Sequence, residues 1–295
     1  MPVKPTLPTF AQLTGLVREM YGDGAVIKDA PRAGIPGSID AKDKLEIVSG
    51  STKTSKVLGV RRTEDLVFRQ RVVDAAVALA DSGANFSGSW KADKVNKALW
   101  TLGYGGRMQV RKFLPDGKIG KPSEALNDIF ENGGAYGFEC ATAMMVIYHK
   151  AILDHLGPEK FDALFSDPKM LAFFRWDIED SDFTAVKSIL ETPGIGARPP
   201  VPGTHYYFAN PDASDENSAF RGENVIYLGE GKYYAHGVVG ATGKYVVTEK
   251  ELLASLSALR KPGAQTVPHR IDLEMKIDGL AVSKLAVPDS DVLTG

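Results

Sequence analysis

The segment that decides the fold runs from Glu131 to Tyr148 and reads ENGGAYGFECATAMMVIY, with Cys140 as the only cysteine among 295 residues. A glycine-rich loop is followed at once by strong helix formers, so the sequence predicts a helix that begins at Cys140. This helix is apolar nearly all round as far as Tyr148, which predicts that its first half is buried centrally. Unpaired backbone N–H groups and the positive end of the helix dipole favour a thiolate at such a position. Cys140 is therefore a candidate nucleophile, and a buried, inert cysteine is the alternative.

Composition places the chain among ordinary globular proteins with one large domain or two small ones. Hydrophobic residues make up 43% and charged residues 24% of the sequence, as is usual for such proteins. The formal net charge of −2 argues against binding to nucleic acid or to a membrane surface. A single cysteine excludes an internal disulfide and any zinc site built from several cysteines.

The sequence carries no visible signal for export or for membrane insertion. The first eight residues, MPVKPTLP, lack the apolar core of a signal peptide. The longest apolar stretch, residues 143–148, is far too short to span a bilayer. We therefore expect a cytoplasmic protein, and secretion without a cleaved signal stays open.

The chain divides into three expected parts. Residues 1–62 are rich in Pro, Gly, Ser, Lys and Asp, which predicts a partly flexible N-terminal extension. Within it we expect one short amphipathic piece near residues 10–20 and a loop-like stretch over residues 22–59. A helix start at Thr63–Glu64 is followed by apolar residues at helical spacing from Val67 onward, so residues 63–280 are the expected catalytic domain. Polar residues 281–295 form the expected C-terminal tail.

Helices dominate the first half of the expected domain and strands the second half. The predicted helices start at Thr63, at Glu124 after a Ser123 cap, at Cys140 and after Pro158, with one strand over 107–114. The predicted strands cover residues 204–209, 223–228, 232–239, 244–247 and 269–275, and a capping box at Thr248–Glu251 opens a helix over 252–260. This order predicts an α+β fold in which the helix that carries Cys140 packs on an antiparallel sheet.

A catalytic cysteine needs a base within hydrogen-bond reach and a group that orients the base. Four of the five histidines are poor candidates. His149 and His155 lie more than two turns beyond Cys140 on the same helix and cannot reach the sulfur. His205 and His269 lie in predicted strands. His236 lies on the second strand of a predicted hairpin and is the best candidate base.

Glu223, on the first strand of the same hairpin, is the candidate partner of His236. A two-residue turn at 229–230 would place the two residues opposite each other, and a turn at 230–231 would make them diagonal neighbours. A three-residue loop would put them on opposite faces unless a bulge intervenes. A carboxylate beside a histidine favours the imidazolium, which in turn lowers the pKa of the thiol. A surface ion pair between the two strands is the alternative.

Several blocks in the right order resemble the bacterial spore-coat transglutaminase (protein-glutamine γ-glutamyltransferase) family. The blocks are ENG at 131–133, FECATA at 138–143, GPEKF at 157–161, NP at 210–211, RGENVI at 221–226 and YAHG at 234–237. The resemblance covers roughly residues 65–275. It implies a papain-like fold and an acyltransferase that forms isopeptide crosslinks between proteins, with no calcium, metal or organic cofactor.

The resemblance also assigns roles to residues. It implies Cys140 as the thiol nucleophile, His236 as the base and Glu223 as the supporting acid, with Glu139 as a partial substitute. It further implies a substrate tunnel lined by the residue at Phe220, where the family sequence carries tryptophan. Two more aromatics, Tyr136 and Phe138, are expected in this tunnel because they precede Cys140 closely.

Three functions stay open at this point. The expected reaction joins an accessible protein glutamine to a protein lysine through a thioester on Cys140. A protein-glutamine deamidase, as a secreted effector, and a catalytically silent coat protein are the alternatives. The expected partners are protein substrates, with neither nucleic acid nor membrane, in the cytoplasm or in the spore coat. An acidic pattern from Asp212 to Glu223 resembles a calcium loop but lacks its required glycine.

Overall fold

The computed structural model describes residues 8–27, 44–49, 57–88, 91–166, 171–173, 194–195 and 199–272. The predicted strand over 269–275 and the loop over 192–203 are described in part, and the tail at 281–295 lies outside these ranges. In the described part of the chain, no helix is both long and apolar enough to cross a membrane.

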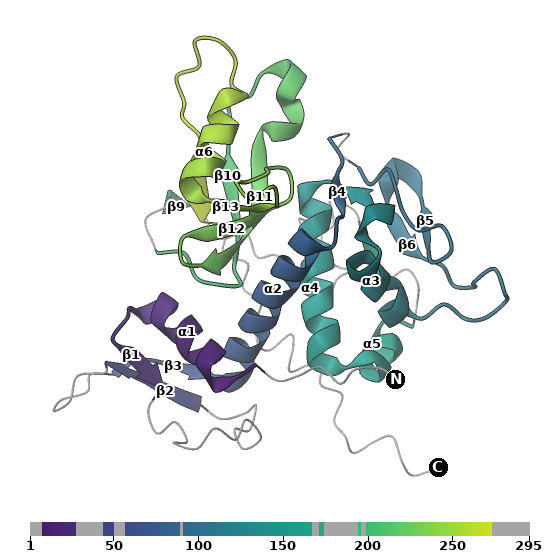
Figure 1. Ribbon diagram of the computed structural model, residues 1–295, viewed down its shortest axis with the longest axis horizontal. Helices are drawn as coiled ribbons and strands as arrows, with labels where there is room; N and C mark the ends of the chain where they lie inside the picture. The colour runs from purple at the N-terminus through teal and green to yellow at the C-terminus, as the bar shows by residue number, and fades with distance from the viewer. Residues whose placement is uncertain are drawn as a thin grey trace.

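Helix α4 (Cys140–Leu156) is the centre of the molecule (Figure 1). Its residues from Thr142 to Leu153 are buried except for Lys150, so its first half is enclosed as the sequence predicts. It packs against α2 (Thr63–Asp81) and against the middle of the large sheet. Burial of this apolar surface stabilises the fold and fixes the position of the helix start.

The remaining helices surround α4 or cap the ends of the sheets. They are α1 (Phe10–Tyr21), α3 (Pro122–Glu131), α5 (Pro158–Leu164) and α6 (Glu249–Ala258), with short 3₁₀ turns at Tyr104–Gly106, Gly133–Ala135 and Asp215–Phe220. Helix α6 begins with the predicted capping box, in which Thr248 and Glu251 bond each other's backbone N–H groups. Helix α3 begins one residue before Ser123, and the expected Ser123 cap is wrong, because that hydroxyl donates to Asp162 of α5.

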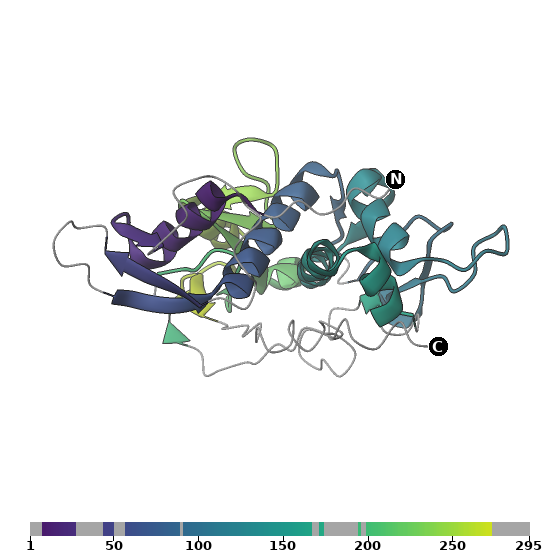
Figure 2. The ribbon, with the colours of Figure 1, turned by 90° about the horizontal axis from the view of Figure 1, so that it is seen from below.

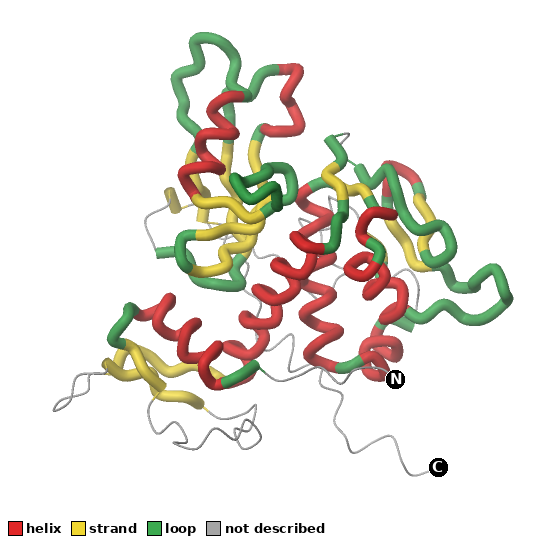
Figure 3. Tube along the Cα trace, viewed as in Figure 1, coloured by secondary structure: helices red, strands yellow, loops and turns green. Residues whose placement is uncertain are grey.

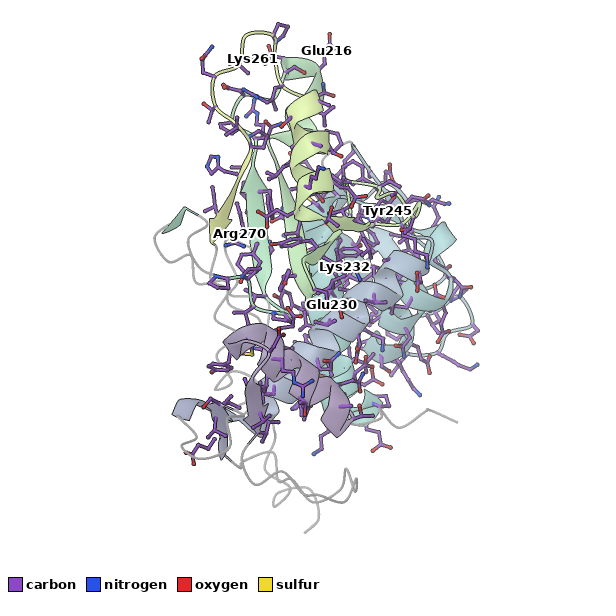
Figure 4. All side chains as sticks on the ribbon, turned by 60° about the vertical axis from the view of Figure 1, so that its left-hand side comes forward. Glu216, Glu230, Lys232, Tyr245, Lys261 and Arg270 are labelled. Carbon is purple, nitrogen blue, oxygen red and sulfur yellow. The ribbon has the colours of Figure 1, made fainter. Side chains whose placement is uncertain are left out.

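The large sheet has six strands in the order β13-β12-β11-β10-β14-β9, all antiparallel. The strands are β9 (Gly194–Ile195), β10 (His205–Ala209), β11 (Gly222–Gly229), β12 (Lys232–Ala235), β13 (Val246–Thr248) and β14 (His269–Asp272). Figure 4 shows Glu230 and Lys232 at the hairpin end of this sheet, and Glu216 and Lys261 at its far end. Helices and an antiparallel sheet in one fold confirm the predicted α+β class.

The two faces of the sheet contact different parts of the protein. Ile226 and Tyr234 pair across β11 and β12 and belong to the core that contains α4. Val225 and Tyr233 point to the other face and pack with Leu252 of α6. Alternation along β11 therefore aims even-numbered residues such as Ile226 at the helices.

Strands β11 and β12 are joined by a two-residue turn and interrupted by a bulge. Gly229 pairs with Lys232 across the turn at Glu230–Gly231, and Glu230 takes a positive φ of 52°. The register shifts by one residue between Tyr227 and Gly229. Such a shift exchanges the faces of all later pairs, so it changes which residues of β12 lie beside those of β11.

The described residues of the N-terminal part form a small unit beside α2 (Figure 2), and residues 28–43 and 50–56 of the expected loop lie outside the described ranges. Helix α1 matches the predicted amphipathic piece. The expected loop over 22–59 contains β1 (Ala25–Ile27), β2 (Lys44–Ser49) and the start of β3 (Val57–Arg62), which form an antiparallel sheet. The sequence missed them because their short apolar runs are separated by stretches rich in Gly, Pro and Lys.

Short strands complete the fold on the far side of α4 (Figure 3). β5 (Trp100–Leu102), β6 (Met108–Val110) and β8 (Ala172–Phe173) form one sheet, so the predicted strand over 107–114 is shorter than expected. β4 (Asn85–Phe86) and β7 (Gly137–Phe138) pair in parallel. This pairing holds Phe86 beside Phe138, one residue before the cap of α4.

His149 is a neutral core histidine, and its burial predicts an acid sensitivity of the fold. Its ring contacts Phe165 and Phe173, its Nδ1 bonds the Met145 carbonyl at 2.7 Å, and burial lowers its pKa from 6.5 to about 4. The unfolded chain gains this proton near pH 6.5 and the folded chain only near pH 4. The stabilisation is therefore present above pH 6.5 and is lost as pH falls toward 4.

The wild-type protein should lose unfolding free energy as the pH falls from 7 to 4. We predict that His149→Phe reduces this loss by up to about 3 kcal/mol. Urea unfolding at several pH values measures this difference. His269→Gln, a half-exposed site on β14, is the matched control and should keep the wild-type pH dependence. An unchanged pH dependence in His149→Phe would contradict the prediction.

Candidate functional site

Cys140 occupies the first position of α4, as the sequence predicts, and Glu139 caps the helix. The Glu139 carboxylate accepts the N–H of Ala141 at 2.6 Å and that of Thr142 at 3.0 Å, and it also accepts the Thr142 hydroxyl. Two N–H groups that begin the helix are thus satisfied by the residue just before the sulfur. The cap places a buried carboxylate next to Cys140.

Two consecutive residues of β11 approach the sulfur. Asn224 donates its side-chain Nδ2–H to Cys140 Sγ at 3.3 Å. Glu223 is buried, and its Oε1 accepts the Gly237 N–H at 2.9 Å. Glu223 Oε2 is buried with no partner at hydrogen-bond distance in the described residues, and the Cys140 thiol is close enough to lower the pKa of this carboxyl group. Such an oxygen has the capacity to accept a proton.

The electrostatics of this group differ from the sequence expectation. Burial raises the pKa of the Cys140 thiol, and the charges of Glu223 and Glu139 raise it further, whereas the Asn224 amide lowers it. Burial also raises the pKa of Glu223 to about 8, against the Gly237 hydrogen bond that lowers it. Burial and the two carboxylates thus favour the thiol form of Cys140 over the expected thiolate.

His236 lies just after β12 and is fully buried beside the same site. Its Nδ1 is 2.7 Å from the Tyr234 hydroxyl, and its Nε2 is 3.2 Å from the Asn85 carbonyl oxygen. Its ring stacks on Phe138 at 4.8 Å, and burial lowers its pKa to about 4. The expected imidazolium beside the thiol is therefore absent from these described contacts, and its role as base stays a prediction.

The bulge explains why Glu223 and His236 do not pair. The turn at Glu230–Gly231 is one of the two that we considered, but the register shift after Tyr227 moves Glu223 opposite Gly237. Neither the facing nor the diagonal arrangement occurs. A bulge leaves no mark that spacing alone can detect.

The predicted tunnel aromatics separate into two groups. Phe138 touches the His236 ring, and Phe220 lies 5.6 Å from Phe86, whose edge meets His236 at 6.1 Å. Tyr136 is fully buried, and its hydroxyl donates to Asp128 of α3. Two of the three aromatics thus border the site, and the third joins the core around α3.

Sequence reasoning missed several residues that the structure brings to the site. Tyr245 bonds the Phe86 N–H at 3.1 Å and packs on His236 at 4.8 Å, where the loop before β13 meets the helices (Figure 4). Asn224 contacts the sulfur, and His205, which reads as a packed sheet residue, contacts Asn224. Strand alternation gave no signal for Asn224, because the residue next to a site acid on a strand is expected to point to the opposite face.

The presence of glycine at position 237 has a steric reason at this site. A Cβ at this position would lie 2.7 Å from Glu223 Oε2 and 3.2 Å from the Phe86 ring. Real Cβ atoms essentially never approach another atom to 2.7 Å, so glycine leaves the space in which the Glu223 carboxylate sits. Among the described residues, no three His, Cys, Asp or Glu side chains are grouped in a way that could hold a metal ion.

Comparisons with known proteins agree over most of the chain. The family model described as protein-glutamine gamma-glutamyltransferase matches residues 43–286, which includes β2 and β3. A protein-glutamine gamma-glutamyltransferase from Bacillus pumilus is 34% identical over 222 residues, 74% of this chain and 80% of that protein. One from Bacillus mycoides is 33% identical over 254 residues, covering 85% and 83% respectively.

A solved structure is similar as well. The transglutaminase from Geobacillus stearothermophilus, without its C-terminal extension, superposes with a TM-score of 0.56 at 29% sequence identity. The match covers 73% of this chain and 92% of that one. Fold and sequence thus point to the same family.

We predict that Gly237→Ala displaces the Glu223 carboxylate and lowers amine transfer to a glutamine substrate by about 100-fold, the cost of a misplacement of about 1 Å. Initial rates and urea unfolding should be measured together, because the folded fraction should change little. Gly134→Ala is the control, since a Cβ there meets no atom within 4 Å. Normal activity in Gly237→Ala would show that the carboxylate position is not required.

Proposed function

Because this chain belongs to the protein-glutamine gamma-glutamyltransferase family and is a transglutaminase, we propose that it crosslinks proteins through a thioester on Cys140. The substrates are then proteins that expose glutamine and lysine side chains. The observation that carries the assignment of the site is the contact group of Cys140. The only cysteine of the chain begins α4 beside the buried Glu223 carboxylate, whose Oε2 lacks a partner among the described residues.

In the first half of the proposed reaction, the sulfur attacks the carbonyl carbon of the glutamine carboxamide. The thiol proton passes to Glu223 as the carbon–sulfur bond forms, because a free thiol is a poor nucleophile. Glu223 then gives the proton to the departing nitrogen, so ammonia leaves and a thioester remains. A pKa of about 8 makes this carboxylate a stronger base than an exposed one.

In the second half, a neutral lysine amine attacks the thioester carbon. The amine proton passes to Glu223 and then to the departing sulfur, which restores the thiol and leaves an isopeptide bond. The developing oxyanion needs N–H donors at the start of α4. Glu139 already occupies those of Ala141 and Thr142, so the Cys140 N–H is the donor that we assign.

Glu223 and His236 take different parts in this proposal. The charge of Glu223 acts on the thiol, whereas both ring nitrogens of His236 lie against other groups. We assign the proton transfer to Glu223, with Glu139 as a partial substitute because its charge also reaches the thiol. His236 then shapes the wall of the site together with Phe138, and its prediction as a base is tested by the pH profile below.

We propose that the reaction needs no calcium. The two end residues of the calcium-like pattern have other partners in the structure. Asp212 Oδ2 accepts the N–H groups of Gln265 at 3.1 Å and Thr266 at 2.8 Å. Glu223, at the other end of the pattern, is buried beside Cys140.

The test is incorporation of a labelled primary amine into a glutamine-containing protein, with EDTA present throughout. Mass spectrometry separates an amine adduct from a glutamate product. Adducts that require Cys140 support the proposal, with Cys140→Ala as the inactive control. Glutamate alone, even at excess amine, would favour a deamidase, and the absence of either product would favour a silent structural protein.

The pKa of Glu223 predicts the pH dependence of the reaction. A general base acts only when ionised, so kcat/KM should rise with pH up to about 8 and level off above it. Glu223→Gln should lower kcat/KM by roughly 100-fold or more and remove this rise. His236→Gln should lower the rate without removing the rise. Loss of the rise in His236→Gln alone would return the role of base to His236.

The position of Phe220 predicts how the thioester partitions between attack by an amine and attack by water. Its ring belongs to the aromatic group that borders the site, and a closed apolar wall keeps water away from a reactive intermediate. Phe220→Ala should raise the ratio of glutamate to amine adduct by roughly tenfold, and Phe220→Trp should lower it. Phe113→Ala, at an exposed aromatic, is the control. An unchanged ratio in both Phe220→Ala and Phe220→Trp would remove Phe220 from the site.

A further inference from the structure

Asn224 and His205 form a chain of contacts that ends at the reactive sulfur. Asn224 Nδ2 is 3.3 Å from Cys140 Sγ, and Asn224 Oδ1 is 2.8 Å from His205 Nε2. His205 pairs with Ile226 across β10 and β11, so it lies diagonally beside Asn224 on the face toward α4. The imidazole is fully buried and Asn224 is half-buried.

The orientation of the Asn224 amide decides what the sulfur meets. An amide has a donor side and an acceptor side. When His205 carries its hydrogen on Nε2, that hydrogen donates to Asn224 Oδ1, and the Nδ2–H of Asn224 then faces the sulfur. When Nε2 carries the lone pair, the Asn224 amide is more stable after a rotation of about 180°, because its Nδ2–H then donates to Nε2. Its oxygen then faces the sulfur instead. The described distances and atoms correspond to the first arrangement.

The orientation of the Asn224 amide matters because negative charge develops on the Cys140 sulfur during the proposed reaction. A sulfur anion develops twice in the proposed reaction, once when the thiol loses its proton and once when the amine expels the sulfur. Among the described residues, the groups that act on the sulfur are acidic or neutral. Glu139 approaches from the helix cap, Glu223 from β11 and the Tyr234 hydroxyl from β12, with His205 on β10 and His236 after β12. Two carboxylates oppose the anion, whereas the side-chain amide and the backbone of Asn224 favour it.

We propose that Asn224 is a catalytic residue that stabilises negative charge on the Cys140 sulfur, and that His205 is the positioning residue that keeps the amide N–H aimed at it. The inference rests on the proposed function for its place in the reaction. The stabilisation of the sulfur itself does not depend on acyl transfer. Burial lowers the pKa of His205 to about 4, which keeps the ring neutral and limits it to one N–H hydrogen.

The test follows the pH dependence of Cys140 alkylation by iodoacetamide, because the chain has no other thiol. Asn224→Ala should move the alkylation profile upward by about 1 to 2 pH units, the worth of one hydrogen bond to a charged group. Asn224→Asp, which keeps the shape and adds a third acid, should move it at least as far. Both should lower kcat with little change in KM.

His205 is tested by rescue. His205→Leu removes the hydrogen bond to Asn224 Oδ1 and should shift the profile in the same direction as Asn224→Ala. His205→Gln retains an N–H donor and should restore part of the wild-type profile. In the Asn224→Ala background, His205→Leu should add no further shift, because both changes remove one interaction.

Asn96→Ala is the control for the Asn224 and His205 variants. Asn96→Ala removes an amide that bonds Asp128 at 2.9 Å, away from the sulfur, and should leave the profile unchanged. Urea unfolding identifies any variant that fails to fold, and Asn224→Asp is the near-isosteric second choice. An unmoved profile in folded Asn224→Ala or Asn224→Asp overturns the inference. A shifted profile in a chain that transfers no amine keeps the inference and removes the proposed function.

Discussion

The structure depends on the burial of the first half of α4 between α2 and the large sheet. The apolar side chains between Ala143 and Leu153 are buried in the main core, and the helix they belong to packs against β11. A helix start presents N–H groups that need acceptors, and here Glu139 supplies them from the residue before the sulfur. Packing thus sets the location of Cys140, and capping sets the first charge beside it.

The same constraint explains the chemistry of the site. A helix dipole and free N–H groups would favour a thiolate, yet burial and two carboxylates raise the pKa of this thiol. The thiol then needs a base that acts during the attack, and Glu223 carries a raised pKa and an unpartnered oxygen among the described residues. Gly237 leaves space for this carboxylate, and Asn224 contributes the opposing donor. Proton transfer in the proposed reaction therefore takes place within one small buried group.

Sequence reasoning predicted the parts of the fold that local chemistry dictates. The helix at Cys140, the helix from Thr63 and the Thr248–Glu251 capping box are confirmed because periodicity and capping are local. The register of β11 against β12 was not predictable, since one bulged residue moves Glu223 away from His236. The thiol pKa was also out of reach, because it depends on burial and on side-chain directions that spacing does not give. The small N-terminal sheet was missed because its strands are short and widely separated.

The most direct measurement is the mass of the enzyme after a rapid acid quench in the presence of a glutamine peptide and the absence of amine. The account predicts an acyl adduct on the peptide that contains Cys140, formed together with an equal burst of ammonia. It also predicts that Glu223→Gln forms this adduct much more slowly than the wild-type chain. Turnover of the glutamine peptide without an adduct on Cys140, or with undiminished burst in Glu223→Gln, would contradict the account.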